Sequence, residues 1–260
     1  MNILESIFEK KKQEVSERKE LYPIKLLEKS IYFNSPTVSL KKYLQRPDLS
    51  GIIAEFKRKS PSKGMINAYA PVERTTIGYM QAGSCALSVL TDQEFFGGKN
   101  EDLMTARKYN YCPILRKDFV IDEYQVLEAK SIGADAILLI AAMLNPSDIE
   151  RLAKFAKESG LEVILEVYSV NELKSNNEYI DILGINNRDL RDFSVELKRS
   201  FEVITATPKG CTCISESGID SSEDIGQLKK AGFQGFLIGE RFMKHSRPEI
   251  ACGEFIKSLK

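Results

Sequence analysis

The chain has 260 residues, of which 43% are hydrophobic, and its 37 basic and 37 acidic residues leave no net formal charge at pH 7. This length suits one large α/β domain, and the balanced charge gives no general reason to expect nucleic acid or an anionic membrane as a partner. No apolar stretch approaches the roughly 20 residues of a membrane span, and residues 1–20 lack a signal peptide's apolar core, so we expect a cytoplasmic protein.

About fifty residues precede the first predicted strand, and they are expected to form a helical extension. An apolar helical stripe with charges on its other face indicates that this extension packs on the main domain; it consists of Ile3, Leu4, Ile7 and Phe8. Glutamates accompany the basic run Lys10–Lys12, which we therefore interpret as a solvated helix face rather than a nucleic-acid or membrane patch.

The first predicted strand lies in the tract Gly51–Gly64 (GIIAEFKRKSPSKG), where an apolar run ends in an acid, three bases and a Ser/Pro/Gly loop. Because side chains of a strand alternate between its two faces, Glu55 and Lys57 share one face at the carboxyl end. Parallel α/β sheets bind their ligands at this edge. The tract is therefore a candidate functional site, the alternative being a solvated strand end followed by a basic turn.

Four times along the chain, a glycine, a short gap and an apolar run follow a helical segment, a pattern typical of a helix-to-strand joint. With the other apolar runs, these joints predict eight strands, near Gly51–Lys57, Ala86–Leu90, Ile114–Lys117, Ala136–Ile140, Val163–Val167, Ile182–Asn186, Thr212–Glu216 and Gly235–Ile238. Helices are predicted near 72–82, 101–109, 122–131, 146–159, 169–175, 196–204, 220–231 and 248–258. Such alternation predicts a (β/α)8 TIM barrel in which residues 1–260 form a single domain, with 1–50 as its N-terminal helical extension. A doubly wound open sheet is the alternative.

Charged and polar residues recur at the predicted strand ends, which a barrel would bring to one mouth. They are Glu55, Lys57, Lys117, Glu166, Asn186, Arg188, Glu216 and Ser217. Burying an unpaired charge is costly, so several lysines and glutamates in apolar strands are expected to face one another. Such pairs shift each other's pKa values, which suits acid–base catalysis.

Other kinds of catalytic site find little support. His245 is the only histidine, and it lies in a polar tract away from any G-x-S-x-G, which disfavours nucleophile–histidine schemes. The five cysteines are interpreted as buried small hydrophobes, and Cys211 and Cys213 form a C-x-C with no histidine near, so no metal site is expected. Neither a dinucleotide-binding nor a P-loop glycine motif occurs.

Each of the last two predicted strands is followed by a glycine, an arrangement that is typical of a phosphate site. Ser217-Gly218 and Gly239-Glu240 follow them, and a short helix is expected at Arg241–Lys244. Glycines there expose backbone N–H groups and a helix amino terminus attracts anions, so we expect a phosphate on the substrate. Ordinary tight turns are the alternative.

In order along the chain, the motifs IAEFKRKSPSKG, TDQEFFGG, ILRKDFVID, GADAILLIAAML, LEVILEV, GINNRDL, ISESGI and FLIGERFM resemble those of the indole-3-glycerol phosphate synthase family. The opening segment ILESIFEKKKQEV is also similar. The resemblance implies a (β/α)8 lyase of tryptophan biosynthesis. Its substrate would be 1-(2-carboxyphenylamino)-1-deoxyribulose 5-phosphate, converted to indole-3-glycerol phosphate, carbon dioxide and water. No metal or organic cofactor is implied, and a monomer or weak homodimer is expected.

The same resemblance implies residue roles. Lys117 would be the general acid for ring closure, Lys57 would contact the substrate carboxylate and assist dehydration, and Glu166 and Glu55 are the candidate bases. Sugar hydroxyls and the lysine side chains would be held by Asn186, Glu216 and Ser217. The apolar ring slot would comprise Phe96, Phe119, Leu138 and Leu190, with Arg188 close by. The phosphate would be bound at Ser60, Gly218, Gly239 and Glu240.

Two alternatives remain at this point. Another phosphate-binding barrel, such as phosphoribosylanthranilate isomerase or the tryptophan synthase α subunit, would lack the lysine-rich tract joined to a long extension. A catalytically silent barrel that serves as a scaffold would not need the glutamates and lysines at its strand ends.

Overall fold

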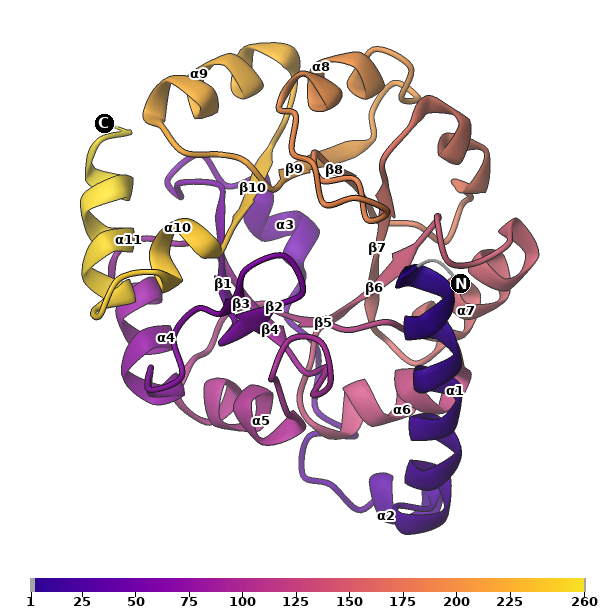
Figure 1. Cartoon of the computed structure of the whole chain (residues 1–260). Helices are drawn as coiled ribbons and strands as arrows, with labels where there is room; N and C mark the ends of the chain where they lie inside the picture. The colour runs from indigo at the N-terminus through magenta and orange to yellow at the C-terminus, as the bar shows by residue number, and fades with distance from the viewer. Residues whose placement is uncertain (1–2, 260) are drawn as a thin grey trace.

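Eight parallel strands form a closed barrel in the computed structural model, which describes residues 3–259 (Figure 1). Around the barrel the strand order is β1-β10-β9-β8-β7-β6-β5-β4. The strands are β1 (Ile52–Phe56), β4 (Ala86–Leu90), β5 (Ile114–Lys117), β6 (Ala136–Ile140), β7 (Glu162–Val167), β8 (Ile182–Asn186), β9 (Thr212–Glu216) and β10 (Gly235–Ile238). The predicted barrel is confirmed, and closure excludes the open-sheet alternative.

Helices cover the outside of the barrel between successive strands (Figure 1). They are α4 (Val72–Gln81), α5 (Asn100–Tyr109), α6 (Glu123–Ser131), α7 (Pro146–Glu158), α8 (Lys198–Ile204), α9 (Ser222–Ala231), α10 (Glu240–Met243) and α11 (Pro248–Lys257). The segment predicted as a helix at 169–175 is a 3-10 helix, η1 (Val170–Ser175). A small hairpin of β2 (Lys59–Ser60) and β3 (Gly64–Met65) follows β1. In residues 3–259, no helix is long and apolar enough to cross a membrane.

The barrel interior is apolar at the level just below the mouth and becomes polar at the mouth itself. Buried residues of this inner cluster include Ile53, Leu115, Ile164 and Ile214. Because strand side chains alternate, the residue two positions further along each strand points to the same inner face. Those residues are Glu55, Lys117, Glu166 and Glu216. The strand period therefore places the four charged side chains in one layer.

Three helices precede the barrel: α1 (Ile3–Leu21), α2 (Ile24–Leu27) and α3 (Leu40–Leu44). The first lies against α6 on the outside (Figure 1), while its Ile7 joins the inner apolar cluster. Leu40 and Leu44 of α3 join the same cluster from the amino-terminal ends of the strands, where Ser39 and Gln45 bond Glu162 and Thr212. The extension therefore packs on the barrel, as predicted.

One prediction for the extension is wrong. Lys10 and Lys12 are exposed, but Lys11 is buried with 1% of its surface accessible, and it forms ion pairs with Asp92 and Asp118. These partners lie far away in sequence, so the local charge pattern could not reveal them. The cysteines were interpreted as buried small hydrophobes, and the structure agrees for all of them except Cys211, which is half-buried.

Candidate active site

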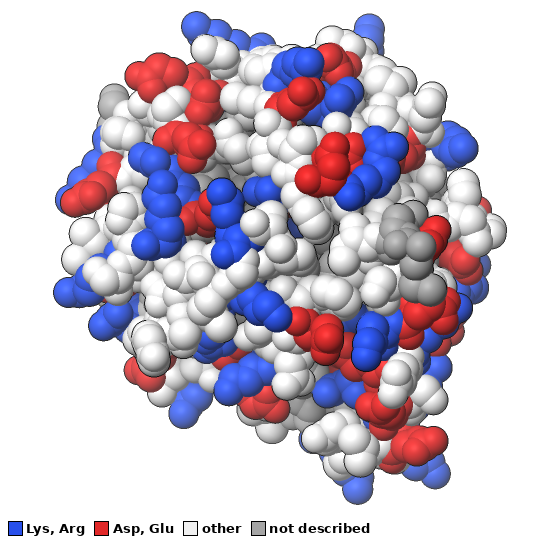
Figure 2. Space-filling view, viewed as in Figure 1, with Lys and Arg blue, Asp and Glu red and all other residues white. Residues whose placement is uncertain are grey.

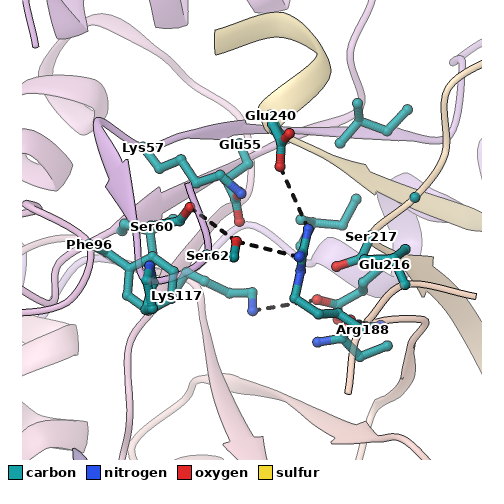
Figure 3. Close-up of a pocket in the computed structure, with 18 of the residues that line it drawn as sticks. Glu55, Lys57, Ser60, Ser62, Phe96, Lys117, Arg188, Glu216, Ser217 and Glu240 are labelled. Carbon is teal, nitrogen blue, oxygen red and sulfur yellow. Dashed lines mark hydrogen bonds and ion pairs between the residues drawn. The ribbon is translucent and has the colours of Figure 1, made fainter. Parts of the chain in front are cut away.

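A cavity of about 480 Å³ opens at the carboxyl ends of the strands, and every predicted catalytic, ring-binding and phosphate-binding residue lines it. The side chains labelled in Figure 3 come from several different strands and loops and point into one space. The sequence analysis missed several lining residues. They include Ser62, Lys63, Asp92, Asp118, Ile140, Arg241 and Lys244. Ser62 and Lys63 belong to the same Ser/Pro/Lys tract as Ser60, which was the available signal.

Two lysines and three glutamates form the charged centre of the cavity. The Lys117 ammonium lies 3.1 Å from Glu166 Oε2 and 3.5 Å from Glu216 Oε2. Lys57 Nζ lies 2.6 Å from Glu55 Oε1, and Asn186 Nδ2 donates to Glu166 Oε1 at 3.0 Å. The paired arrangement predicted from the strand ends is therefore present, and it supplies proton donors and acceptors next to each other.

The surroundings push the pKa values of Lys117 and Glu216 above their usual range. Burial by itself would lower the pKa of Lys117, but the charges of Glu166, Glu216 and Glu55 outweigh it and raise that pKa. Burial is the largest cause for Glu216, and repulsion by Glu166 and Glu55 adds to it, so its pKa rises to about 7 despite Lys117. Glu216 is thus the carboxylate whose charge changes near neutral pH.

Two glycines leave the room that these carboxylates occupy. A Cβ added at Gly239 would lie 2.9 Å from Cδ of Glu55, and one at Gly184 would overlap Oε1 of Glu216 and lie 3.1 Å from Cγ2 of Ile164. Real Cβ atoms essentially never approach other atoms closer than 3.0 Å. Sequence reasoning had interpreted Gly239 only as a phosphate contact, and it missed Gly184 because nothing local marks it.

Basic side chains lie beside the hollow at the centre of the face in Figure 2, and hydroxyl side chains line the cavity together with them. Arg188 Nη2 lies 3.6 Å from Glu240, and its Nη1 donates to Ser62 at 3.4 Å (Figure 3). Ser217 and Gly218 have φ values of 69° and 70°. A non-glycine residue in this left-handed region is strained, and such strain is concentrated at functional sites.

Aromatic and aliphatic side chains form another part of the cavity wall. The rings of Phe96 and Phe119 lie 5.9 Å apart between centroids and are tilted by 43°. Leu138 and Leu190 complete the predicted ring slot. This wall offers a flat apolar ligand group a place to stack, while the charged centre and the basic rim would bind its polar ends.

A closed (β/α)8 barrel whose mouth unites a lysine–glutamate centre, an apolar wall and a basic rim defines a TIM-barrel enzyme for a small anionic substrate. Among such enzymes, the chain belongs to the indole-3-glycerol phosphate synthase family, since the family model "Indole-3-glycerol phosphate synthase" matches residues 4–255. The family resemblance is confirmed, and the isomerase-type barrels and the silent scaffold are set aside.

Curated relatives of the chain carry the same family name. An indole-3-glycerol phosphate synthase from Bacteroides thetaiotaomicron is 46% identical over 99% of each chain. Another from Salinibacter ruber is 39% identical over 100% of this chain and 96% of the relative. Among solved structures, a thiamine phosphate pyrophosphorylase from Pyrococcus furiosus matches with a TM-score of 0.61 at 17% identity, covering 85% of this chain and 98% of the other. The last similarity supports the barrel fold alone.

Proposed function

We propose that the chain converts 1-(2-carboxyphenylamino)-1-deoxyribulose 5-phosphate to indole-3-glycerol phosphate, carbon dioxide and water. Family membership supports this activity, and one observation carries its mechanism. The Lys117 ammonium stands between two carboxylates, at 3.1 and 3.5 Å, in a cavity with an apolar wall and a basic rim. The wall suits the substrate's aromatic ring, and the rim suits its phosphate.

Ring closure is the first step. The ring carbon that bears the carboxylate attacks the ketone carbon, and Lys117 Nζ gives a proton to the ketone oxygen, which becomes a hydroxyl. The bond to the carboxylate then breaks, its electron pair restores aromaticity, and carbon dioxide leaves. Glu166 and Glu216 keep Lys117 protonated before the reaction, because their charges stabilise the ammonium.

Dehydration is the second step. The new hydroxyl leaves as water after taking a proton from Lys57, and Glu166 removes a proton from the neighbouring methylene carbon, which forms the double bond of the five-membered ring. Glu55 supports this role of Lys57 by its ion pair at 2.6 Å, and Asn186 fixes Glu166 by a hydrogen bond. Over both steps the two lysines give two protons to the substrate and Glu166 takes one from it, so the overall reaction consumes one proton from solvent.

Substrate orientation follows from the two ends of the cavity. We assign the aromatic ring to the slot of Phe96, Phe119, Leu138 and Leu190, and the phosphate to Ser60, Gly218, Gly239 and the start of α10 at Glu240. First-turn N–H groups of a helix have no partner within it and can bind an anion. Because the Glu240 carboxylate faces Arg188, only its backbone is suited to the phosphate. All these residues belong to this chain, so the proposed site requires no residue from a second copy.

The chain's composition gives a direct assay. It contains no Trp, so an indole formed in the reaction can be followed by fluorescence excited beyond the absorption of its tyrosines. We expect the wild-type chain to produce this signal from the carboxyphenylamino substrate. Lys117→Met should lose about 10²–10⁴-fold in kcat while retaining its fold by circular dichroism. Near-normal turnover by Lys117→Met would remove the general acid from this account.

A further inference from the structure

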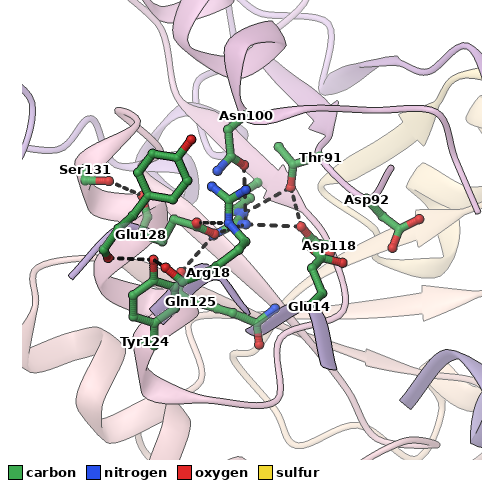
Figure 4. A network of polar contacts seen from close by, with 12 residues as sticks. Glu14, Arg18, Thr91, Asp92, Asn100, Asp118, Tyr124, Gln125, Glu128 and Ser131 are labelled. Carbon is green, nitrogen blue, oxygen red and sulfur yellow. Dashed lines mark hydrogen bonds and ion pairs between the residues drawn. The ribbon is translucent and has the colours of Figure 1, made fainter. Parts of the chain in front are cut away.

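Lys11 of α1 is the only residue of the N-terminal extension whose charged group is buried beside the cavity among the described residues 3–259. Its ammonium lies 2.9 Å from Asp92 Oδ2, 2.9 Å from Asp118 Oδ1 and 2.7 Å from Glu14 Oε2. The two aspartates line the cavity and are themselves buried, each side chain being 1% exposed. Figure 4 shows Glu14, Asp92 and Asp118 in the polar network between α1 and the barrel.

Each aspartate holds the backbone of one loop that carries the apolar wall. Asp92 Oδ1 accepts the N–H groups of Phe95 and Phe96, at 2.7 and 3.2 Å. Asp118, which follows Lys117 directly, accepts the N–H of Phe119 at 2.8 Å and the hydroxyl of Thr91 at 2.5 Å. The rings of Phe96 and Phe119 thus depend on two carboxylates that share Lys11.

Without a shared cation, these two carboxylates would be costly to keep charged in the interior. Asp118 has a second cationic partner, Arg116, at 3.2 Å. Asp92 has no ion pair besides Lys11 within the described part of the chain. The ion pairs with Lys11 therefore offset the cost of burying both aspartates, which accept from the loop N–H groups, and hydrogen bonds to charged groups are the stronger ones.

We propose that Lys11 is a positioning residue of the active site: from outside the barrel it fixes, through Asp92 and Asp118, the loops that present Phe96 and Phe119 to the substrate's aromatic ring. This inference deepens the proposed function and rests on it for the identity of the bound ring. Helix α1 thereby supports substrate binding as well as folding.

The kinetic test compares Lys11→Met with two variants of the same helix. Lys12→Met removes an exposed charge. Arg18→Met removes another ion pair to the barrel, that with Glu128, whose side chain accepts from Arg18 and Arg116 rather than from the phenylalanine loops. We expect Lys11→Met to raise KM at least about tenfold, the equivalent of 1.4 kcal/mol of lost binding, with a smaller change in kcat. Lys12→Met should match the wild type, and Arg18→Met should lower Tm without raising KM.

The double variant Lys11→Met with Asp92→Asn covers the case in which the single variant fails to fold. It removes one charge of each sign, and Asn can still accept from Phe95 and Phe96. We expect it to fold and to keep KM at least about threefold above the wild-type value, a loss of roughly 0.6 kcal/mol in binding. A folded Lys11 variant with wild-type KM, or an equal rise of KM in Arg18→Met, would overturn the proposal.

Amide hydrogen exchange gives a readout that needs no turnover. In Lys11→Met the N–H groups of Phe96 and Phe119 should exchange faster than in the wild type, whereas amides of the distant helix α9 should not change. In the double variant the Phe119 N–H should still exchange faster. Unchanged exchange at both phenylalanines would contradict the role of Lys11. If the wild-type chain lacks turnover but Lys11→Met still shows faster exchange at these two amides, the result would instead count against the proposed function.

Discussion

Lys117 and Glu216 lie 3.5 Å apart, and burial by itself shifts their pKa values in opposite directions. Burial disfavours the charged form of both, but the charges of Glu166, Glu216 and Glu55 raise the pKa of Lys117, so the lysine stays charged, while Glu216 has its pKa raised to about 7. The site thus holds one group that is charged throughout the physiological range and one that titrates within it. Glu216 is therefore the residue whose protonation should be visible in both stability and activity.

Glu216→Gln should change how stability depends on pH. Between 4.5, the pKa of an unperturbed glutamate, and about 7, the folded wild type binds more protons at Glu216 than the unfolded chain does, so its unfolding free energy falls as pH rises. Gln does not titrate. The unfolding free energy of the variant should therefore rise relative to that of the wild type across this pH window, by up to about 3 kcal/mol in total, and the difference should not change below pH 4.5. Denaturant unfolding at several pH values measures this; a constant difference would contradict it.

Gly239→Ala should impair catalysis through Glu55. The added methyl group would lie 2.9 Å from Cδ of Glu55, so the carboxylate has to move away from Lys57. We expect kcat to fall at least about tenfold, or 1.36 kcal/mol in the barrier, and KM to change as well if the phosphate contact is disturbed. Gly226→Ala is the matched control, because a Cβ there meets nothing within 4 Å. Equal kinetics for the two variants would show that Gly239 makes no room for Glu55.

At the scale of elements, the helix α3 closes the end of the barrel opposite the site. Leu40 is fully buried there in the inner apolar cluster. Leu40→Ala should lower the unfolding free energy by about 2–5 kcal/mol, because it removes buried methyl groups and leaves a cavity. Its kcat and KM, measured well below Tm, should stay at wild-type values. Leu21→Ala, at a residue that is 69% exposed, is the control. Altered kinetics in Leu40→Ala would mean that the two barrel ends are coupled.

The strands were predictable because each is a short apolar run and four of them follow a glycine joint, and most boundaries agree with the structure to within a residue. The site was predictable from Glu55, Lys117, Glu166 and Glu216 because strand alternation fixes their common face. The burial of Lys11 and the space left by Gly184 were not predictable. Both depend on contacts between segments that are distant in sequence, and no local pattern marks such contacts.

For the whole molecule, barrel and extension act together. The closed sheet sets one layer of charged side chains above an apolar layer, and the extension contributes α3 at the amino-terminal end of the barrel and Lys11 beside the mouth. Figure 1 shows that α1 runs along the outside of the barrel next to α6, far from the chain's other end. Residues from the start of the chain therefore support a site whose charged groups come from the strands.

The central claim is that this mouth couples ring closure to decarboxylation and dehydration. The most direct test incubates the full chain with the carboxyphenylamino substrate and measures carbon dioxide release and indole formation in the same sample. We expect the two products to appear in a one-to-one ratio and both to be lost in Lys117→Met. Carbon dioxide without indole, or neither product from a folded wild-type chain, would contradict it.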